Sequence, residues 1–446
     1  AARDINANGL NLVAQLIARD PQDANRLSLS CNPDLTFDLF DELARLGKPR
    51  PFAIAEVDPN LPWLDGPCAV PADFFDLVLD LPGPAPELFA LVREPVGDVD
   101  HAIGLYASTL VRDGGTLQIG IGSMGDALTA ALLARQADNE SYRLLLTDLD
   151  VYQWAPLISR EGGVEPFARG LYGCSEMFVN GFMALIDAGV IRREVFNHDG
   201  LQRLLNAGRI GLIPDEGMLS ALLEARIIGS PLSRADVSFM HHFGILRKEV
   251  DWVEGQLICG DQVLATDVAD AQVRGAIALH MLGDRLQHGY LLHGGFFIGP
   301  NSFYTRLREM PRDLLQKINM TRISYINELF GHENVAREQR RDARFINTTM
   351  MVTLLGAAVS DGLDDGNLIS GVGGQYNFVA QAHTLPDARS ILMLRSWRLN
   401  KKGKPVSNIV WSYGHVTIPR HLRDIFVTEY GIADVRGMSD ADVVKR

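Results

Sequence analysis

The carboxylate of Glu176 is the strongest candidate for chemistry in this chain. It lies in GLYGCSEMFVNGFMALIDAGVI (170–191), after a glycine-rich approach and before an amphipathic run, so little nearby in the sequence would solvate it. A carboxylate in such surroundings is either paired with a cation or kept reactive. From the residues alone, Glu176 could equally be an acid in the first turn of a helix, where it favours the helix dipole.

A first glycine loop lies at TLQIGIGSMGDAL (116–128). Gly120, Gly122 and Gly125 form a G-x-G-x-x-G between a predicted strand and a predicted helix, and Asp148 follows at the predicted end of the next strand. This spacing is typical of a dinucleotide site. Glycines also let backbone N–H groups approach a pyrophosphate or a reaction oxyanion, and a tight turn without a ligand accounts for them too.

A second glycine loop lies at SGVGGQYNFVAQA (370–382). Its residues are, in order, Gly371, Gly373, Gly374, Gln375 and Asn377. The exposed amides of such a loop could hold a carbonyl oxygen or another polar group of a ligand. A strand–loop–helix turn without a ligand is the alternative.

The elements around these motifs predict an α/β fold. Strand, glycine turn, helix and strand succeed one another from residue 101 onward, which is typical of a parallel sheet flanked by helices. The patterns predict helices at 10–18, 35–47, 101–114, 126–136, 175–189, 217–227 and 303–311, and strands at 51–56, 116–122, 142–149, 209–214, 350–359 and 390–395. The proline-rich stretch 59–95 is expected to be a loop.

The pattern divides the chain into two α/β domains, 1–295 and 296–446. Residues 231–295 change character and are expected to elaborate the first domain. The run AREQRRDARFIN (336–347) carries four arginines and is expected to be a solvated helix face, or else a contact for the phosphates of a ligand. Both ends of the chain could be truncated, since it opens without Met and stops inside a predicted helix.

The composition excludes several classes of function. The 446 residues carry a net charge of −13, which argues against non-specific binding of nucleic acid. Hydrophobic residues make up 47% and charged residues 22%, as in an ordinary globular protein. The four cysteines are widely spaced, which favours a reducing cytoplasm over a disulfide framework. No apolar run reaches about 18 residues, so no membrane span is expected.

Four segments together resemble the acetyl-CoA hydrolase/transferase family, a branch of the family I CoA-transferases that includes 4-hydroxybutyrate/acetate CoA-transferases. They are TLQIGIGSMGDAL, SEMFVNGFMALIDAGVI, SGVGGQYNFVAQA and FVTEYGIADVRG (426–437), and the resemblance covers roughly 100–446. The chain departs from the family pattern at Asn377, where Asp is usual, and at Gly173–Cys174. Residues 198–295 are also longer than in compact members.

The resemblance implies that Glu176 attacks an acyl-CoA thioester. Residues of the two loops would then hold the oxyanion or the acyl-CoA: Gly120, Gly122, Gly371, Gly373, Gly374, Gln375 and Asn377. It further implies two CoA-transferase-type domains with the site at their interface, an acyl-CoA and a small carboxylate as substrates, no metal, no cofactor beyond CoA, no membrane or nucleic-acid partner, and a cytoplasmic homodimer.

Transfer of CoA through a glutamyl-CoA thioester is therefore the expected reaction. Hydrolysis of acetyl-CoA is the first alternative. A non-catalytic CoA-binding module and an NAD-dependent dehydrogenase built on Gly120–Gly125 and Asp148 are further ones. The sequence has no H-E-x-x-H, no G-x-S-x-G and no P-loop motif. This excludes the zinc proteases, serine hydrolases and NTPases that carry these motifs.

Overall fold

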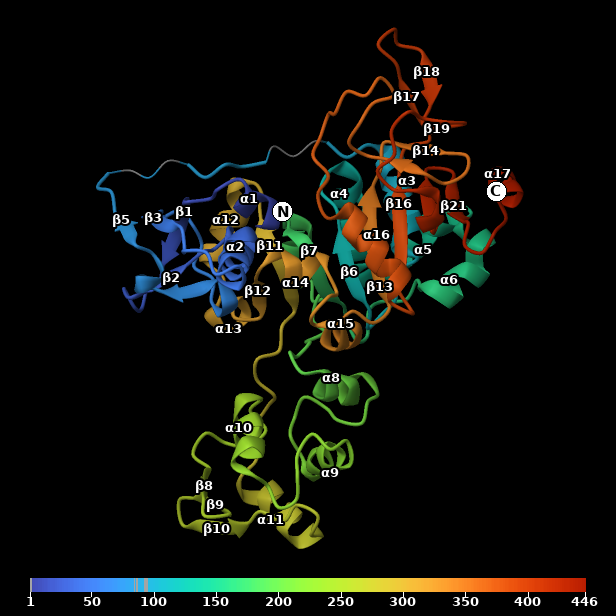
Figure 1. Cartoon of the computed structure of the whole chain (residues 1–446). Helices are drawn as coiled ribbons and strands as arrows, with labels where there is room; N and C mark the ends of the chain where they lie inside the picture. The colour runs from blue at the N-terminus through green and yellow to red at the C-terminus, as the bar shows by residue number, and fades with distance from the viewer. Residues whose placement is uncertain (1, 84, 86, 92–94) are drawn as a thin grey trace. The chain divides into compact units, whose positions relative to one another are not determined.

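The core of the protein is an eight-stranded sheet, seen in a computed structural model that describes residues 2–83, 85, 87–91 and 95–446. The strand order is β12-β11-β7-β6-β13-β16-β20-β21 (Figure 1), and only the last pair runs antiparallel. In that order the strands are Ile318–Met320, Leu292–Phe297, Tyr172–Phe178, Thr116–Ile119, Ala343–Thr348, Arg389–Met393, Ile425–Thr428 and Gly431–Asp434. The predicted α/β class with mostly parallel strands is confirmed.

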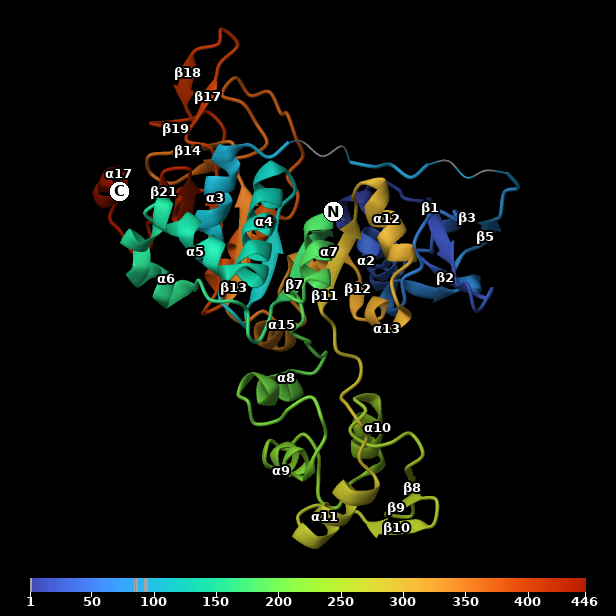
Figure 2. The same ribbon diagram turned by 180° about the vertical axis from the view of Figure 1, so that it is seen from behind.

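Helices cover both faces of this sheet, because parallel strands need crossover connections that return over a face. One face carries α3 (Asp98–Ser108), α4 (Ser123–Ala137) and α7 (Asn180–Asp187), which lie in front in Figure 2. The other carries α14 (Ile323–Asn327) and α16 (Gln375–Thr384), which lie in front in Figure 1. The sheet strands are therefore buried from both sides.

The first part of the chain forms a smaller five-stranded sheet of order β4-β2-β1-β3-β5. These strands are Ala69–Pro71, Arg26–Ser28, Leu12–Arg19, Phe52–Val57 and Leu77–Leu79. Helix α2 (Pro33–Arg45) contacts both β11 and α14 of the large sheet. The N-terminal part therefore packs on the elements next to β7.

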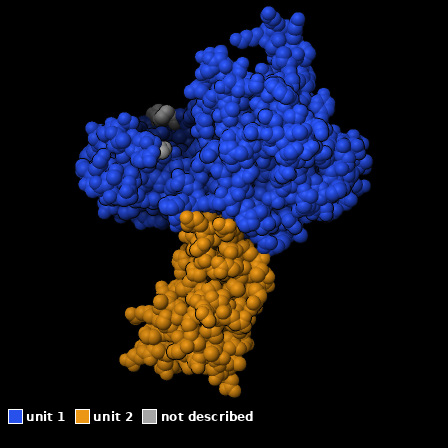
Figure 3. Space-filling view, turned by 45° about the vertical axis from the view of Figure 1, so that its right-hand side comes forward, with its two compact units in different colours: residues 1–193, 291–331, 340–446 blue, residues 194–290, 332–339 orange. Residues whose placement is uncertain are grey.

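Two compact units divide the chain, shown in different colours in Figure 3. The large sheet and the N-terminal part belong to residues 1–193, 291–331 and 340–446. The second unit comprises residues 194–290 and 332–339 and has its own buried core, which includes Phe196, Met218 and Ile277. The boundary predicted at residue 295 falls inside β11, and strands from both sides of it share the large sheet.

The second unit is mostly helical. Its elements are α8 (Asp199–Asn206), α9 (Glu216–Glu224), α10 (Arg234–His242), β8 (Asp251–Val253), β9 (Gln256–Cys259), β10 (Gln262–Ala265), α11 (Ala271–His280) and α15 (Glu333–Gln339). The first unit also contains α1 (Ala2–Ala7), α5 (Asn139–Asp148), α6 (Ala155–Glu161), α12 (Asn301–Arg308), α13 (Arg312–Leu315), β14 (Met351–Thr353), β15 (Ala358–Val359), β17 (Trp397–Leu399), β18 (Pro405–Ser407), β19 (Ile409–Val410) and α17 (Asp440–Lys445). No helix in the described residues combines the length and apolar character needed to cross a membrane.

Several predicted elements are wrong. Residues 142–149 form part of α5 and not a strand: Tyr142 and Leu146, four residues apart, are buried, while Leu144 and Leu145 are exposed, which is helical spacing. Residues 12–19 form β1 and not a helix, because they pair with β2 and β3. Residues 209–214 form no strand. The stretch 59–95 contains short elements as well as loop, and residues 84, 86 and 92–94 lie outside the described residues.

The predicted helix at 175–189 begins later than expected. Strand β7 runs through Phe178, and helix α7 begins only at Asn180. Glu176 therefore lies on a central strand and is not an acid in the first turn of a helix. Both neighbours of β7 supply backbone partners, and such a buried strand has no alternating pattern that could distinguish it from a helix.

The arginine run 336–347 is not a solvated helix face. Helix α15 ends at Gln339, and Arg340 and Arg344 are each only 1% exposed. Arg340 donates to the carbonyl of Tyr325 at 2.6 Å, and Arg344 donates to the carbonyl of Leu110 at 2.9 Å. These two buried arginines hold structure together and cannot reach a CoA phosphate in solvent.

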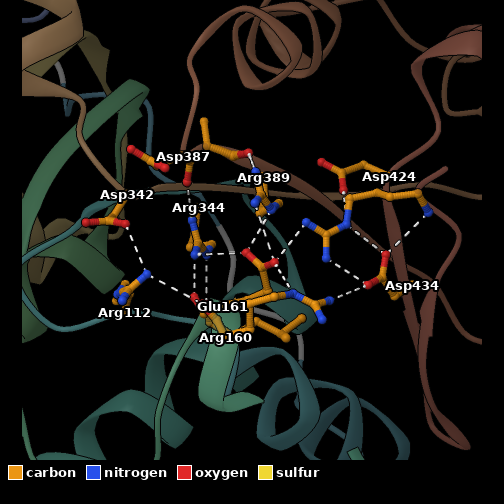
Figure 4. Close-up of polar contacts among 12 residues, drawn as sticks. Arg112, Arg160, Glu161, Asp342, Arg344, Asp387, Arg389, Asp424 and Asp434 are labelled. Atoms are coloured by element: carbon orange, nitrogen blue, oxygen red, sulfur yellow. Dashed lines mark hydrogen bonds and ion pairs between the residues drawn. The ribbon is translucent and has the colours of Figure 1, made fainter. Parts of the chain in front are cut away.

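Glu161 gathers four arginines at the amino ends of β13 and β16 (Figure 4). Its carboxylate oxygens lie 2.9 Å from Arg160 Nε, 2.8 Å from Arg389 Nε and 3.6 Å from an Arg344 amino group. Arg436 pairs with the same carboxylate at 2.9 Å. Since Arg344 and Arg389 lie opposite each other on neighbouring strands, the single acid between them offsets part of the repulsion between two like charges.

Replacing Glu161 with Gln should lower the free energy of unfolding by about 3–5 kcal/mol, because it leaves the buried Arg344 without a counter-charge. Urea unfolding followed by circular dichroism measures this. Glu165→Gln is the matched control. Its pair with Arg143 is exposed, and it should change stability by no more than about 0.5 kcal/mol. Equal effects of the two variants would contradict the structural role of Glu161.

The stability difference between wild type and Glu161→Gln should depend on pH. Burial alone would raise the pKa of Glu161, but hydrogen bonds from Arg160 and Arg389 outweigh it and hold the pKa at about 2. The lowered pKa means that this stabilisation is complete above about pH 4.5 and is lost as the pH falls toward 2. The stability difference between wild type and Glu161→Gln should therefore shrink over that range.

Candidate active site

Glu176 lies near the carboxyl end of β7, between β6 and β11. Continuing the registers of β7 with its neighbours places Gly120 and Gly295 level with Glu176, on the same face of the sheet. Neither residue has a side chain. Neither neighbour therefore places a side chain of its own beside the carboxylate, although on the Gly295 side the Ile323 side chain fills the adjacent space, 2.6 Å from where a Cβ atom would lie.

The Asn327 side chain holds the Glu176 carboxylate from the face of the sheet that α14 covers. Its Nδ2 donates to Glu176 Oε2 at 2.9 Å. Asn327 is the last residue of α14, a short helix that contacts both β7 and β11. Its own Oδ1 is buried without a hydrogen-bond partner among the described residues, so the orientation of this amide depends on the bond to Glu176. The amide fixes where one carboxylate oxygen lies.

Helix α14 is anchored by the N-terminal part of the chain. Asp38 of α2 accepts hydrogen bonds from the Ser324 backbone N–H at 3.2 Å and from the Ser324 hydroxyl at 2.8 Å. Arg322 also pairs with Asp38. The carboxylate of Asp38 thus satisfies a donor at the start of the helix that ends at Asn327, and so positions the amide against Glu176.

The second glycine loop approaches the same carboxylate. A Cβ atom built at Gly374 would overlap Oε2 of Glu176, and one at Gly373 would lie 3.1 Å from Oε1. Only glycine allows the backbone so close to a charged side chain. The loop and the carboxylate, almost two hundred residues apart in the sequence, form one site in space.

This loop leads into α16, with Gly374 at its N-cap position. The first N–H groups of a helix have no partner within the helix and carry partial positive charge. Here the first intrahelical bond is from the Phe378 N–H to the Gly374 carbonyl. The amides of the first turn therefore lie where they could stabilise negative charge developing next to Glu176.

The other predicted residues of this loop lie at different distances from the carboxylate. Gln375 turns away, because its Nε2 donates to the Thr348 carbonyl at 3.2 Å and ties the start of α16 to β13. Asn377 is half-buried in the first turn of α16. Gly371 is exposed, and a Cβ atom there would meet nothing within 4 Å. Their roles toward a substrate stay predictions.

The first glycine loop lies beside the site and has a strong structural role. The Gly120 N–H donates to the Ile346 carbonyl at 3.1 Å, so it is not an open oxyanion donor. A Cβ atom at Gly125 would overlap the Gly120 carbonyl, so this glycine lets α4 pack closely on the loop. Gly122 has a φ of 109°, which only glycine adopts readily. Asp148, which the dinucleotide interpretation placed after a strand, ends helix α5.

A second acid lies within electrostatic reach of Glu176. Burial raises the pKa of the Asp34 carboxyl, and the negative charges of Glu176 and Asp38 raise it further. Asp34 lies one turn before Asp38 on α2. The surroundings of Glu176 are therefore anionic on the α2 side, which disfavours additional negative charge there.

The buried thiol next to Glu176 is a poor competing nucleophile. Burial raises the pKa of the Cys174 thiol, so little thiolate is present near neutral pH. The neighbouring Tyr172 hydroxyl is fully buried and bonded to His293 Nδ1 at 2.7 Å. No group of three His, Cys, Asp or Glu in the described part of the chain could hold a metal ion. Glu176 stays the candidate for covalent chemistry that the sequence predicts.

Two cavities open at the carboxyl edge of the sheet. One of about 290 Å³ lies at the ends of β6, β7 and β11 and includes Gly120, Gly122 and Val179. The other, of about 950 Å³, lies at the ends of β13, β16 and β20 and includes Thr348, Arg395 and Arg398. Ligands of open α/β sheets bind at this edge.

Sequence reasoning missed Asn327 and Asp34. Nothing in SYINEL (324–329) marks Asn327 as special, because its contact depends on how α14 packs on β7. Asp34, in the first turn of α2, looks in the sequence like an ordinary acid that favours the helix dipole. Only the packing of α2 on α14 brings it near Glu176.

Comparison with known proteins agrees with the resemblance. Residues 299–446 match the acetyl-CoA hydrolase/transferase C-terminal domain family. A 4-hydroxybutyrate coenzyme A transferase of Clostridium kluyveri is 20% identical over 387 residues, which cover 86% of this chain and 58% of that protein. A succinyl-CoA:acetate CoA-transferase of the same organism is 28% identical over 134 residues, 29% of this chain and 23% of that one. This chain thus spans little more than half the length of the first relative.

Solved structures show the same fold. RipA from Yersinia pestis superposes with a TM-score of 0.57 at 19% identity, covering 100% of this chain and 68% of that one. A 4-hydroxybutyrate CoA-transferase from Porphyromonas gingivalis gives 0.55 at 17% identity, covering 99% and 72%. Glu176 and the first glycine loop lie outside the matched range 299–446, whereas Asn327 and the second loop lie inside it.

The buried Cys68 and Cys174 and the half-buried Cys31 should resist alkylation in the folded protein, because the pKa of each thiol is raised. Burial raises the pKa of Cys31 and Cys68 to about 12 and also raises that of Cys174. With iodoacetamide at about pH 8, the half-buried Cys259 should therefore be labelled first. Peptide mass spectrometry measures the order in which the cysteines are labelled, and all four cysteines should react in urea. Labelling of Cys174 as fast as Cys259 would show that the floor of the site is open to solvent.

Proposed function

Since residues 299–446 match the acetyl-CoA hydrolase/transferase family, we propose that this protein moves CoA from an acyl-CoA to a carboxylic acid, with Glu176 as nucleophile. The observation that carries the proposal is the convergence on one carboxylate of the Asn327 amide and the Gly373–Gly374 backbone. Three chain segments distant in sequence meet at Glu176, which is what positioning a nucleophile requires.

The first half of the reaction forms two successive acyl derivatives of Glu176. A carboxylate oxygen attacks the thioester carbonyl, and collapse of the tetrahedral oxyanion breaks the C–S bond, which gives an acyl-glutamyl anhydride and CoA thiolate. The thiolate then attacks the glutamyl carbonyl of the anhydride. The donor acid leaves as its carboxylate, and Glu176 is left as a glutamyl-CoA thioester.

The second half reverses these steps with the acceptor. The acceptor carboxylate attacks the glutamyl thioester, CoA thiolate leaves, and the thiolate then attacks the acyl carbonyl of the new anhydride. The new acyl-CoA departs and the Glu176 carboxylate is regenerated. No proton is consumed over the cycle, and ping-pong kinetics are expected. If water attacks in place of the acceptor acid, the same site becomes an acyl-CoA hydrolase.

The chain's own residues serve these steps in different ways. Asn327 holds one oxygen of Glu176, which leaves the other to attack. The first-turn amides of α16 are the proposed oxyanion donors, because they point out of the helix beside the carboxylate. The glycines at 373 and 374 keep that helix end close to the nucleophile.

Trapping the covalent intermediate tests the proposal. After incubation with acetyl-CoA, borohydride or hydroxylamine should modify an activated carboxyl that peptide mass spectrometry maps to Glu176. Glu176→Ala should show no modification, and Cys174→Ala, the matched control, should still be modified. Formation of propionyl-CoA on adding propionate indicates transfer, and steady release of CoA without it indicates hydrolysis. An unmodified wild type that still binds acetyl-CoA would reject Glu176 as nucleophile.

Removing a positioning contact should affect turnover more than binding. Loss of one transition-state donor typically costs about 10²–10³ in kcat. We expect losses of this order for Asn327→Ala, and also for Gly374→Ala, whose methyl group overlaps Glu176 Oε2. Steady-state kinetics with acetyl-CoA separate kcat from KM, thermal melting controls for folding, and the exposed Asn8→Ala is the control. A change confined to KM would mean that these contacts only bind substrate.

A further inference from the structure

Two helices hold the carboxylate of Glu176, and both can do so only at one spacing. Asn327 ends α14 and donates to Glu176 Oε2, while Gly374 begins α16 and packs against the same oxygen. Both helices lie on the same face of the large sheet, in front in Figure 1. The contacts that join α14 to α16 therefore bear directly on the geometry of the site.

The side chain of Arg340 joins the two helices. One of its amino groups donates to the Tyr325 carbonyl at 2.6 Å. The other donates to the Ile326 carbonyl at 3.2 Å and to the side-chain oxygen of Gln381 on α16. Gln381 completes the contact, because its Nε2 donates to the Ile326 carbonyl at 3.1 Å. We call the side chains of Arg340 and Gln381 the interhelical clamp.

The clamp holds each helix close to its contact with the carboxylate. Tyr325 and Ile326 directly precede Asn327, and the last carbonyls of a helix have no partner within it, so donors from outside fix that end of α14. Gln381 lies seven residues after Gly374, which is roughly 10 Å along α16. Because a short helix moves as one body, fixing Gln381 also fixes where the helix begins.

The guanidinium of Arg340 is buried and bonds only to neutral oxygens. The residue is 1% exposed, and it forms no ion pair with any carboxylate of the described residues. Burying a charge without an acid partner is costly. Packing alone does not need that charge, whereas reaching acceptors on two helices at once needs the planar fork of donors that arginine has.

The clamp lies on the side of the sheet that carries Glu176. Burial raises the pKa of the Cys174 thiol, and the positive charge of Arg340 is the largest influence that opposes this rise. Side chains two residues apart on a strand point to the same face, so Cys174 and Glu176 share one face of β7. Arg340 is therefore near the strand that presents the carboxylate, and not only near the helices.

We propose that Arg340 is a positioning residue for the reaction of Glu176. With Gln381 it sets the spacing of α14 and α16 at which the Asn327 amide and the first turn of α16 act on one carboxylate. This inference rests on the proposed function, because it needs Glu176 to be the reacting group. No hydrogen bond joins Arg340 to Glu176 in the described part of the chain, so its effect reaches the carboxylate through the two helices.

Removing the fork of donors tests the proposal. Arg340→Met keeps a side chain of similar length. We expect kcat for CoA transfer from acetyl-CoA to propionate to fall roughly 10- to 100-fold and KM to change by less than about twofold, because a small misplacement of reacting groups costs turnover more than binding. Gln381→Leu removes the α16 side of the clamp and should show the same split. Unchanged kcat in both variants would overturn the proposal.

Arg135→Met is the matched control. Arg135 is 2% exposed and also donates to backbone carbonyls, those of Ser108, Val111 and Glu165, at 2.7–3.2 Å. It belongs to α4, on the opposite face of the sheet. Both variants should lower the melting temperature, because each removes donors from buried carbonyls, but only Arg340→Met should lower kcat. Equal losses of kcat in the two variants would reduce the clamp to a general effect of stability.

Two further comparisons distinguish the clamp from a simple effect of charge. Arg340→Lys keeps the positive charge, but a single ammonium cannot serve both helices, so it should recover little of the lost kcat. Because Arg340 acts through the Asn327 amide, the loss in the Arg340→Met/Asn327→Ala double variant should be clearly smaller than the product of the two single losses. Wild-type kcat in Arg340→Lys, or losses that multiply, would contradict the positioning role.

Trapping with acetyl-CoA and hydroxylamine separates this proposal from the proposed function. The expected result is an adduct on Glu176 in wild type and in Arg340→Met, formed more slowly in the variant. Equal rates in the two proteins would show that the clamp is wrong while Glu176 stays the nucleophile. Absence of any adduct in wild type would instead reject the proposed function, and the positioning role with it.

Discussion

The close approach of a helix start to the Glu176 carboxylate is the constraint on which the rest of the site depends. Oε2 of Glu176 occupies the space that a side chain at position 374 would take, so the carboxylate, Gly374 and the N-terminus of α16 can be arranged in one way only. The Asn327 amide fixes the same oxygen from α14. Asp38 in turn fixes the start of α14. Elements from three distant parts of the chain are thereby held to one oxygen atom.

The position of the start of α16, at the carboxyl edge of the sheet, depends on ion pairs at the amino edge. Arg344 and Arg389 lie in register near the starts of neighbouring strands, and Glu161 pairs with both. At its far end, β13 reaches Thr348, whose carbonyl accepts the Gln375 side chain at the start of α16. A short strand is rigid along its length, so fixing its amino end also fixes where α16 begins. The buried ion network is thus part of what positions the site, although none of its members lies near Glu176.

The sequence pointed to Glu176 and to the second glycine loop, which the structure brings together, but not to the elements that carry them. The glycine loops and Glu176 were recognisable because their residue types and spacing are visible in the sequence before any packing is known. Strand β7 was not, because a central parallel strand is buried on both faces and shows no alternation. Three consecutive leucines at 144–146 resembled a buried strand. Leu144 and Leu145 are exposed, however, so the run belongs to a helix with one buried side. Asn327 could not be found, since its contact exists only after α14 has packed.

The place of the second unit in the chain accounts for the boundary that the sequence suggested near residue 295. Strands β7 and β11 are neighbours in the sheet, yet residues 194–290 separate them in the chain. A parallel pair always needs a long crossover, and here helix α7 is followed by a unit with its own hydrophobic core before the chain returns to β11. The register of the two strands is kept across it, with Ser175 opposite Gly294, so Gly295 still lies beside Glu176. Since the unit's core is separate, its length can change without moving β7, β11 and the Glu176 carboxylate that β7 carries.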